Sequence, residues 1–146
     1  MKTGTLDFLR MLVEGAPQQA AMGLKLIGVE EGHATLALPY REDLVGFPET
    51  GVIAGGAIYT LMDAASGVAV FLALARFQPI ATLDLRIDYL KPATPGKTIH
   101  GRAQCYKVTR HVAFVRGLAY HDDADTPIAH VSGTFIIGDK GRKDAA

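Results

Sequence analysis

Two features of one apolar stretch could carry chemistry: a glycine pair, Gly55-Gly56, and a carboxylate, Asp63. Between positions 57 and 75, Asp63 is the one charged side chain. A glycine pair at the start of a helix leaves the first backbone N–H groups uncovered, and those groups and the helix dipole favour negative charge. An aspartate in apolar surroundings is uncommon unless it is paired or functional. Gly55 and Asp63 are therefore the leading candidates for a site.

The apolar stretch around Asp63 must be enclosed by lipid or by protein. Residues 52–75 are long enough to cross a bilayer, which takes about 20 apolar residues. The glycine pair, the many alanines and Asp63 near the middle argue against this, since a mid-bilayer aspartate costs roughly 2.5–3.5 kcal/mol. We expect a buried central helix over about residues 55–76 and no membrane span.

The rest of the chain predicts strands that surround this helix. A short amphipathic helix is expected over about residues 5–14, and a charged tail over about 138–146. Strands are expected over residues 24–31, 33–39, 81–90, 98–109, 111–120 and 128–137. Residues 81–90 alternate most clearly, with Leu83 and Leu85 on the apolar face and Thr82 on the polar one. An antiparallel sheet wrapped around one long central helix, an α+β fold in a single domain 1–146, satisfies both patterns.

Composition excludes several classes of function. The 15 basic and 15 acidic side chains balance without a basic stripe, which argues against nucleic acid as a partner. The five histidines are scattered without metal-ligand spacing, so we expect no metal site. The first 17 residues carry acids and lack the apolar core of a signal peptide, and Cys105 is the sole cysteine. These features predict a cytoplasmic protein without an internal disulfide.

Two segments, GVIAGGAIYTLMDAASG from Gly51 and ATLDLRIDYLKPATPG from Ala81, resemble the hotdog-fold acyl-CoA thioesterases of the phenylacetate-degradation type. The most specific parts of this likeness are the glycine pair, Asp63 eight residues after Gly55, and the strand ending at residues 89–92. The resemblance implies a hotdog fold and hydrolysis of a small, aromatic or medium-chain acyl-CoA. It implies no cofactor, because coenzyme A is part of the substrate. It also implies a homodimer, or a tetramer of paired dimers, with the site at the subunit interface.

The resemblance assigns roles to particular residues. The backbone N–H of Gly55, and that of Gly56, would polarise the thioester carbonyl, and Asp63 would be the base or the nucleophile. Thr82 falls where related thioesterases place a Ser or Thr that holds the attacking water; the alternative is an ordinary β-branched strand residue.

Arg110 and His111 fall where the family often places a Gly-Arg pair near the coenzyme A phosphates, and Lys91 is a further candidate for binding the substrate. Arg110 and His111 lie between two expected strands, and Lys91 follows another. Lys91 and Arg110 could pair with phosphate. The alternative for each is a solvated surface charge.

Helix geometry limits how Gly55 and Asp63 can act together. Eight residues of helix rise about 12 Å. The two groups of one chain therefore cannot both touch one thioester carbon. A two-fold dimer with antiparallel central helices would bring Gly55 of one chain near Asp63 of the other.

The sequence departs from the family pattern at Ala54. Family members commonly carry a His immediately before the glycine pair and an Asn a few residues earlier, where this chain has Ala54 and Pro48. That His is thought to orient the carbonyl; Tyr59 is one residue that could compensate. Three functions stay open: an acyl-CoA thioesterase, a non-catalytic acyl-CoA-binding protein, which Ala54 favours, and a hotdog dehydratase or hydratase. The last would want a His near an Asp, so Ala54 argues against it.

Overall fold

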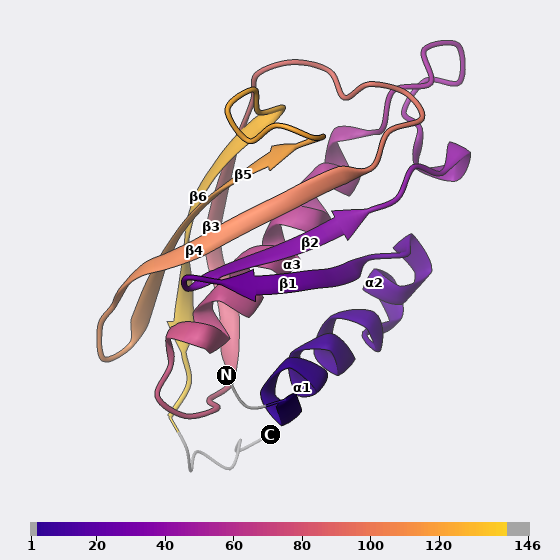
Figure 1. The fold of residues 1–146 in the computed structure, drawn as a ribbon. Coiled ribbons are helices and arrows are strands. Elements are labelled where there is room, and N and C mark those ends of the chain that lie inside the picture. Colours follow the sequence, from indigo (N-terminus) through magenta and orange to yellow (C-terminus); the bar gives the residue numbers. More distant parts are fainter. Residues whose placement is uncertain (1–2, 140–146) are drawn as a thin grey trace, which may run out of the picture.

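The computed structural model describes residues 3–139 and has the expected α+β architecture (Figure 1). The helices are α1 (Thr3–Glu14), α2 (Pro17–Met22) and α3 (Gly55–Ala73), with a 3-10 turn at Glu42–Leu44. The strands are β1 (Lys25–Glu30), β2 (His33–Leu38), β3 (Ile80–Tyr89), β4 (Ile99–Val108), β5 (Val112–Tyr120) and β6 (Ala129–Ile137). The first helix starts two residues before the expected position 5. Of the expected tail, residues 140–146 lie outside the described part.

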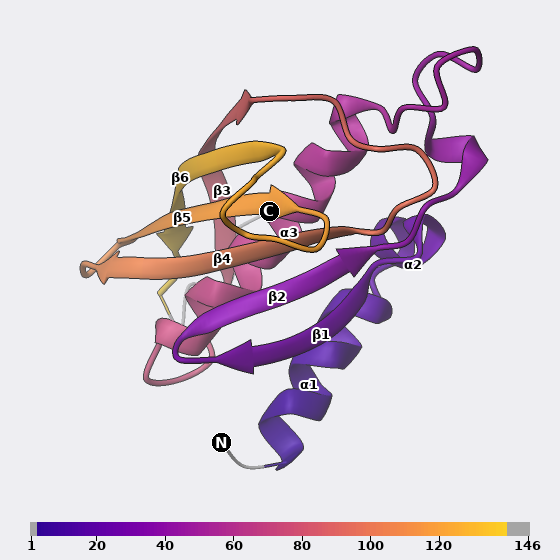
Figure 2. The ribbon, with the colours of Figure 1, turned by 45° about the horizontal axis from the view of Figure 1, so that its top comes forward.

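The six strands form one antiparallel sheet in the order β1-β2-β4-β5-β6-β3. The sheet curls around α3, which lies along its inner face, while α1 and α2 lie at the β1 side (Figure 2). Leu61, Met62 and Ala65 on α3 are fully buried beneath the sheet. This is the predicted hotdog arrangement, and β1 and β3 are its two edges.

The central helix is a core helix although its length and composition would also suit a membrane span. It ends at Ala73 and not near residue 76, so the expected boundary was wrong. Leu74 adopts an extended backbone (φ −80°, ψ 134°), and its N–H donates to Val70 O at 3.1 Å. Ala75 and Arg76 are exposed, so no core contact favours a further turn.

The two N-terminal helices pack beside β1 because α1 presents an apolar stripe to the core. Leu9 and Val13, one turn apart, are 2% exposed. Pro17 begins α2, and Gly23 ends it with a left-handed backbone (φ +76°) that glycine adopts without strain. The Glu14 carboxylate accepts the Leu26 N–H at 3.1 Å and so ties α1 to β1.

The alternation predicted for the edge strand β3 is interrupted. A β-bulge lies between Thr82 and Asp84, so Leu83 is the extra residue in the ladder with β6. Leu83 is 55% exposed while Leu85 is buried. Thr82 pairs with the buried Phe135 and points to the helix side of the sheet. The expectation that Leu83 shares the buried face and Thr82 the opposite one was therefore wrong, because the bulge shifts the two-residue period by one.

Candidate active site

The start of α3 offers uncovered backbone donors. Ala54 is the N-cap and provides no side-chain cap, while its own N–H donates to Leu44 O at 2.9 Å. The Ala57 N–H donates to Ala54 O at 3.0 Å. Among residues 3–139, the N–H groups of Gly55 and Gly56 have no hydrogen-bond partner. Together with the helix dipole, these two donors can stabilise a negatively charged oxygen.

Gly55 is held against the end of β3 by Tyr89. The Tyr89 hydroxyl donates to Gly55 O at 2.7 Å, and a Cβ on Gly55 would lie 3.0 Å from that hydroxyl oxygen. Burial, and secondarily the neighbouring Tyr59, raises the pKa of Tyr89, which keeps the phenol protonated as a donor. A cavity of about 460 Å³ opens here, and its wall includes Gly55, Ile58, Tyr89 and Lys91.

Asp63 lies farther along α3 and is paired with Thr82. The Thr82 Oγ1 donates to Asp63 Oδ1 at 2.7 Å, so the helix carboxylate and the edge strand meet. Asp63 is half-buried in the single chain. No other hydrogen bond to its carboxylate occurs within residues 3–139, which leaves Oδ2 available to a water or a substrate.

A second cavity, of about 260 Å³, lies beside this pair. Asp63, Thr82 and Gln19 are the polar members of its wall. The remaining wall is apolar or glycine and comes from α1, α3, β3 and β6: Leu12, Val13, Ala64, Gly67, Val68, Phe71, Ile80, Ala81 and Phe135. A carboxylate next to an apolar cavity suits a substrate with a reactive polar centre and an apolar tail.

Gln19 had no role in the sequence analysis. Its Oε1 is buried without a hydrogen-bond partner in the described part of the chain. No motif marks it, because its place in the cavity wall arises from the packing of α2 against α3.

The remaining candidates are dispersed. The Tyr59 hydroxyl donates to Leu85 O at 2.8 Å and so links α3 to β3. Lys91 lines the Gly55 cavity.

Arg110 and His111 are exposed in the β4–β5 turn, at the end of the sheet away from the start of α3 (Figure 1). Within one chain, the structure thus groups Asp63 with Thr82, and Gly55 with Lys91, but not the two groups with each other.

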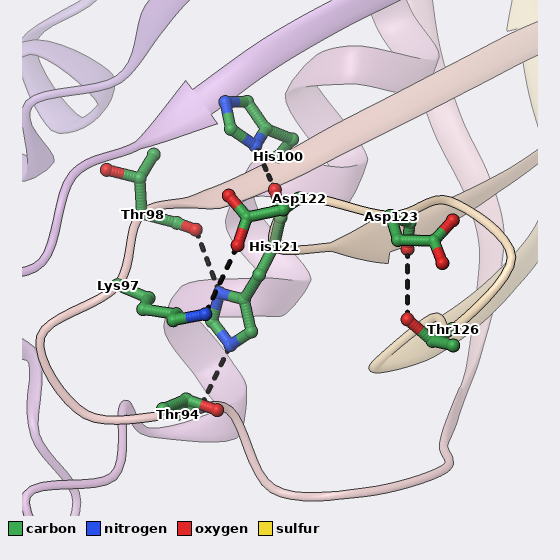
Figure 3. A network of polar contacts seen from close by, with 8 residues as sticks. All are labelled: Thr94, Lys97, Thr98, His100, His121, Asp122, Asp123 and Thr126. Atoms are coloured by element: carbon green, nitrogen blue, oxygen red, sulfur yellow. Dashed lines mark hydrogen bonds and ion pairs between the residues drawn. The ribbon is translucent and has the colours of Figure 1, made fainter.

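A histidine network fixes the connection that borders the Gly55 cavity (Figure 3). His121 Nε2 accepts the Thr94 N–H at 2.8 Å, and its Nδ1 lies 2.9 Å from Thr98 O. One ring nitrogen therefore accepts and the other donates, which is the neutral Nδ1–H tautomer. Lys97 Nζ pairs with Asp122 Oδ2 at 3.2 Å. This network is structural, and within residues 3–139 no three His, Cys, Asp or Glu side chains gather in a way that could hold a metal ion.

Comparison with known proteins places this geometry in context. Residues 50–128 match the family described as the Thioesterase superfamily. The medium/long-chain acyl-CoA thioesterase YigI of Salmonella typhimurium is 29% identical over 141 residues, covering 88% of this chain and 90% of that protein.

Two solved structures have the same fold. A protein of Pseudomonas aeruginosa is 45% identical with a TM-score of 0.81, covering 90% of this chain and 97% of that one. A mutant of the phenylacetic acid degradation protein PaaI from Thermus thermophilus is 27% identical with a TM-score of 0.72, covering 83% and 98%.

Proposed function

Because the chain belongs to the Thioesterase superfamily and is a thioester hydrolase, we propose that it hydrolyses medium- or long-chain acyl-CoA to a free acid and coenzyme A. The observation that carries this proposal is the Asp63–Thr82 pair beside an otherwise apolar cavity. The name of the YigI relative, a medium/long-chain acyl-CoA thioesterase, supports the substrate class.

In the proposed reaction, Asp63 is the general base. A water held between Asp63 Oδ2 and the Thr82 hydroxyl gives a proton to the carboxylate as its oxygen attacks the thioester carbon. The developing oxyanion accepts the N–H of Gly55, and that of Gly56, at the start of a second copy of α3. Collapse of the intermediate breaks the C–S bond, and the departing thiolate takes the proton back from Asp63.

This reaction needs a two-fold dimer, because about 12 Å of helix separates Gly55 from Asp63 in one chain. We propose that β3 is covered by a second copy, with the two α3 helices antiparallel. Two observations support this: β3 is an edge strand, and Leu83 on it is 55% exposed. A long edge strand with exposed apolar side chains is a template for pairing with another chain. Pairing of two such dimers into a tetramer is the further expectation from the family.

The same assembly suggests where coenzyme A lies. Lys91 borders the Gly55 cavity, and an antiparallel arrangement would bring the β4–β5 turn of the other chain toward that end. We propose that Lys91 of one chain and Arg110 and His111 of the other bind the phosphates.

A second function is favoured by Ala54, which cannot orient a carbonyl as an imidazole can. In that case the protein would bind acyl-CoA without efficient turnover. Tyr59 does not replace the missing side chain in the single chain, because its hydroxyl is engaged with Leu85 O.

Free-thiol release from a panel of acyl-CoA thioesters separates the two functions. The comparison is the unaltered protein against Asp63→Asn, with Asp125→Asn in the exposed β5–β6 turn as the matched control. Turnover that collapses only in Asp63→Asn supports the proposed hydrolase. Turnover that survives in Asp63→Asn removes Asp63 from its role. Binding of acyl-CoA with no thiol release from any thioester would establish the binding protein instead.

A further inference from the structure

Neither the backbone conformation nor the packing requires a glycine at position 67, inside a helix. Gly67 lies in the interior of α3 and is absent from the glycines with positive φ. A Cβ there would lie 3.8 Å from Phe135 Cε1 and 4.0 Å from Ile80 Cδ1, which are ordinary contacts. At Gly117 and Gly133, by contrast, a Cβ would come within 2.6 Å and 2.5 Å of backbone oxygens. Glycine destabilises a helix interior relative to alanine, so its presence at position 67 needs another reason.

The space that Gly67 leaves open belongs to the cavity beside Asp63. Residue 67 is one helical turn after residue 63, so the two lie on the same face of α3, and both line this cavity. A side chain at position 67 would project toward Phe135 and Ile80, two apolar members of the cavity wall. Enlarging residue 67 would therefore fill the apolar part of the cavity next to Asp63.

The cavity has the size and chemistry for an aliphatic chain. An apolar cavity of roughly 150 Å³ already holds benzene, and this one measures about 260 Å³. Beyond the polar residues 19, 63 and 82, its wall carries no charged or hydrogen-bonding side chain. A thioester placed at Asp63 would thus direct its acyl chain past Gly67 toward Phe71 and Phe135.

We infer that Gly67 determines the acyl-chain preference of this protein, by leaving room for an aliphatic chain in the same protomer whose Asp63 meets the thioester. The inference rests on the proposed function for the position of the thioester. It adds the residue that discriminates between acyl chains of different length, and the class of tail, aliphatic, that the cavity takes.

The test compares kcat/KM for butanoyl-, octanoyl-, dodecanoyl- and hexadecanoyl-CoA in the unaltered protein, Gly67→Ala and Gly67→Leu. The control Ala73→Leu adds the same side chain at the exposed end of α3. Gly67→Leu should lower kcat/KM for the longer chains about tenfold or more, as an extra methylene in a filled pocket does. Butanoyl-CoA should change by less than about twofold. Gly67→Ala should show a smaller shift in the same direction and a higher melting temperature, so the inference stays testable if Gly67→Leu folds poorly.

An unchanged chain-length profile in both Gly67 variants would overturn the inference. So would an equal loss for all four substrates, since that would show damage to Asp63 and not to the chain pocket. Calorimetric binding of the same acyl-CoAs separates this inference from the proposed function. If the unaltered protein binds dodecanoyl-CoA without hydrolysing it and Gly67→Leu does not bind it, the inference stands and the proposed reaction fails. If the unaltered protein neither hydrolyses nor binds any acyl-CoA, both fail.

Discussion

The hydroxyl of Thr82 on β3 donates a 2.7 Å hydrogen bond to the carboxylate of Asp63 on α3, and this contact depends on a bulge in the edge strand. Regular alternation back from the buried Leu85 would turn Thr82 outward. The extra residue, Leu83, restores Thr82 to the helix side. A bulge beside a site is a common way to re-aim a side chain, and here it joins a hydroxyl to the proposed base.

Thr82→Val removes the hydroxyl while keeping the shape of the side chain. Hydrogen bonds to charged groups are worth about 1.5–3 kcal/mol, so we expect kcat to fall about ten- to hundredfold. KM should change little, because the proposed role of the hydroxyl is to position water and not the acyl chain. Steady-state thiol release measures both constants. Thr82→Ser should retain most of the activity; a serine variant as slow as the valine variant would contradict a role for the hydroxyl.

General-base and nucleophilic roles for Asp63 differ in whether an acyl-enzyme anhydride forms, and an anhydride opened at the Asp63 carbon leaves solvent oxygen on the protein. In a single turnover in water enriched in heavy oxygen, a water-attack route places the label in the released acid. Attack by the carboxylate would instead form an Asp63–acyl anhydride; water that opened this anhydride at the Asp63 carbon would leave the label on the protein and send an unlabelled Asp63 oxygen into the first product. We expect label in the first acid released, read by mass spectrometry. Label confined to the Asp63 peptide would replace the base mechanism with an acyl-enzyme anhydride.

Much of the fold could be predicted because local pattern and global packing agree. Alternation of apolar and polar residues located all six strands to within a residue or two at each end, and the apolar run located α3. Prediction failed at the C-terminal end of α3, where the local pattern and the packing conflict. The apolar sequence continues through Leu74 and Ala75, but the helix stops at Ala73, where the core that would bury another turn is absent.

The candidate site was less predictable, since its geometry is tertiary. Asp63 and the glycine pair stand out in the sequence because a carboxylate and flexible residues are rare in a core helix. The bulge that turns Thr82 inward, the Tyr89 contact with Gly55 and the place of Gln19 in the cavity wall have no local signal. Each depends on which strand or helix is packed against α3.

Tyr89→Phe should alter stability differently at neutral and at high pH. At neutral pH the variant loses one hydrogen bond, to Gly55 O, and about 0.5–1.5 kcal/mol of unfolding free energy. The folded-state pKa of Tyr89 is raised above 10.0, so this tyrosine stabilises the fold fully below that pH. As pH rises from 10.0 through the folded pKa, the unfolded phenol ionises before the folded one, and that contribution is lost. The difference in unfolding free energy between the unaltered protein and Tyr89→Phe, measured in urea, should therefore narrow above about pH 10. A difference that stays constant with pH would contradict this.

Gln19→Met tests the cost of the unpartnered oxygen in the cavity wall. A buried polar atom without a hydrogen bond costs about 1–3 kcal/mol, and methionine has nearly the same length without the amide. We expect the unfolding free energy to rise by about 1 kcal/mol. Gln18→Met on the exposed side of α2 should leave it unchanged. A lower stability for Gln19→Met would contradict this expectation and would show that the amide is hydrogen-bonded in solution, with water as the partner.

A mixing experiment tests whether each site takes Gly55 from one chain and Asp63 from the other. Asp63→Asn removes the base, and Gly55→Val crowds the N–H donor against Tyr89, where even a Cβ would lie 3.0 Å from the hydroxyl. Each variant alone should be nearly inactive. After unfolding and refolding together, half of the dimers pair one of each, and each mixed dimer holds one intact site of two. We therefore expect about one quarter of the unaltered activity to return.

Activity returns only if each site takes Gly55 and Asp63 from different chains, as the antiparallel dimer does. If both groups acted within one chain, every chain in the mixture would lack one of them, and no activity would return. Light scattering of the mixture establishes that dimers have formed, so a failure to recover activity cannot be attributed to dissociation. A monomer cannot recover activity, because roughly 12 Å separates Gly55 from Asp63 along α3 of one chain. Mixing thus tests the shared site directly, and a dimer without recovery would require another carbonyl-binding group near Asp63.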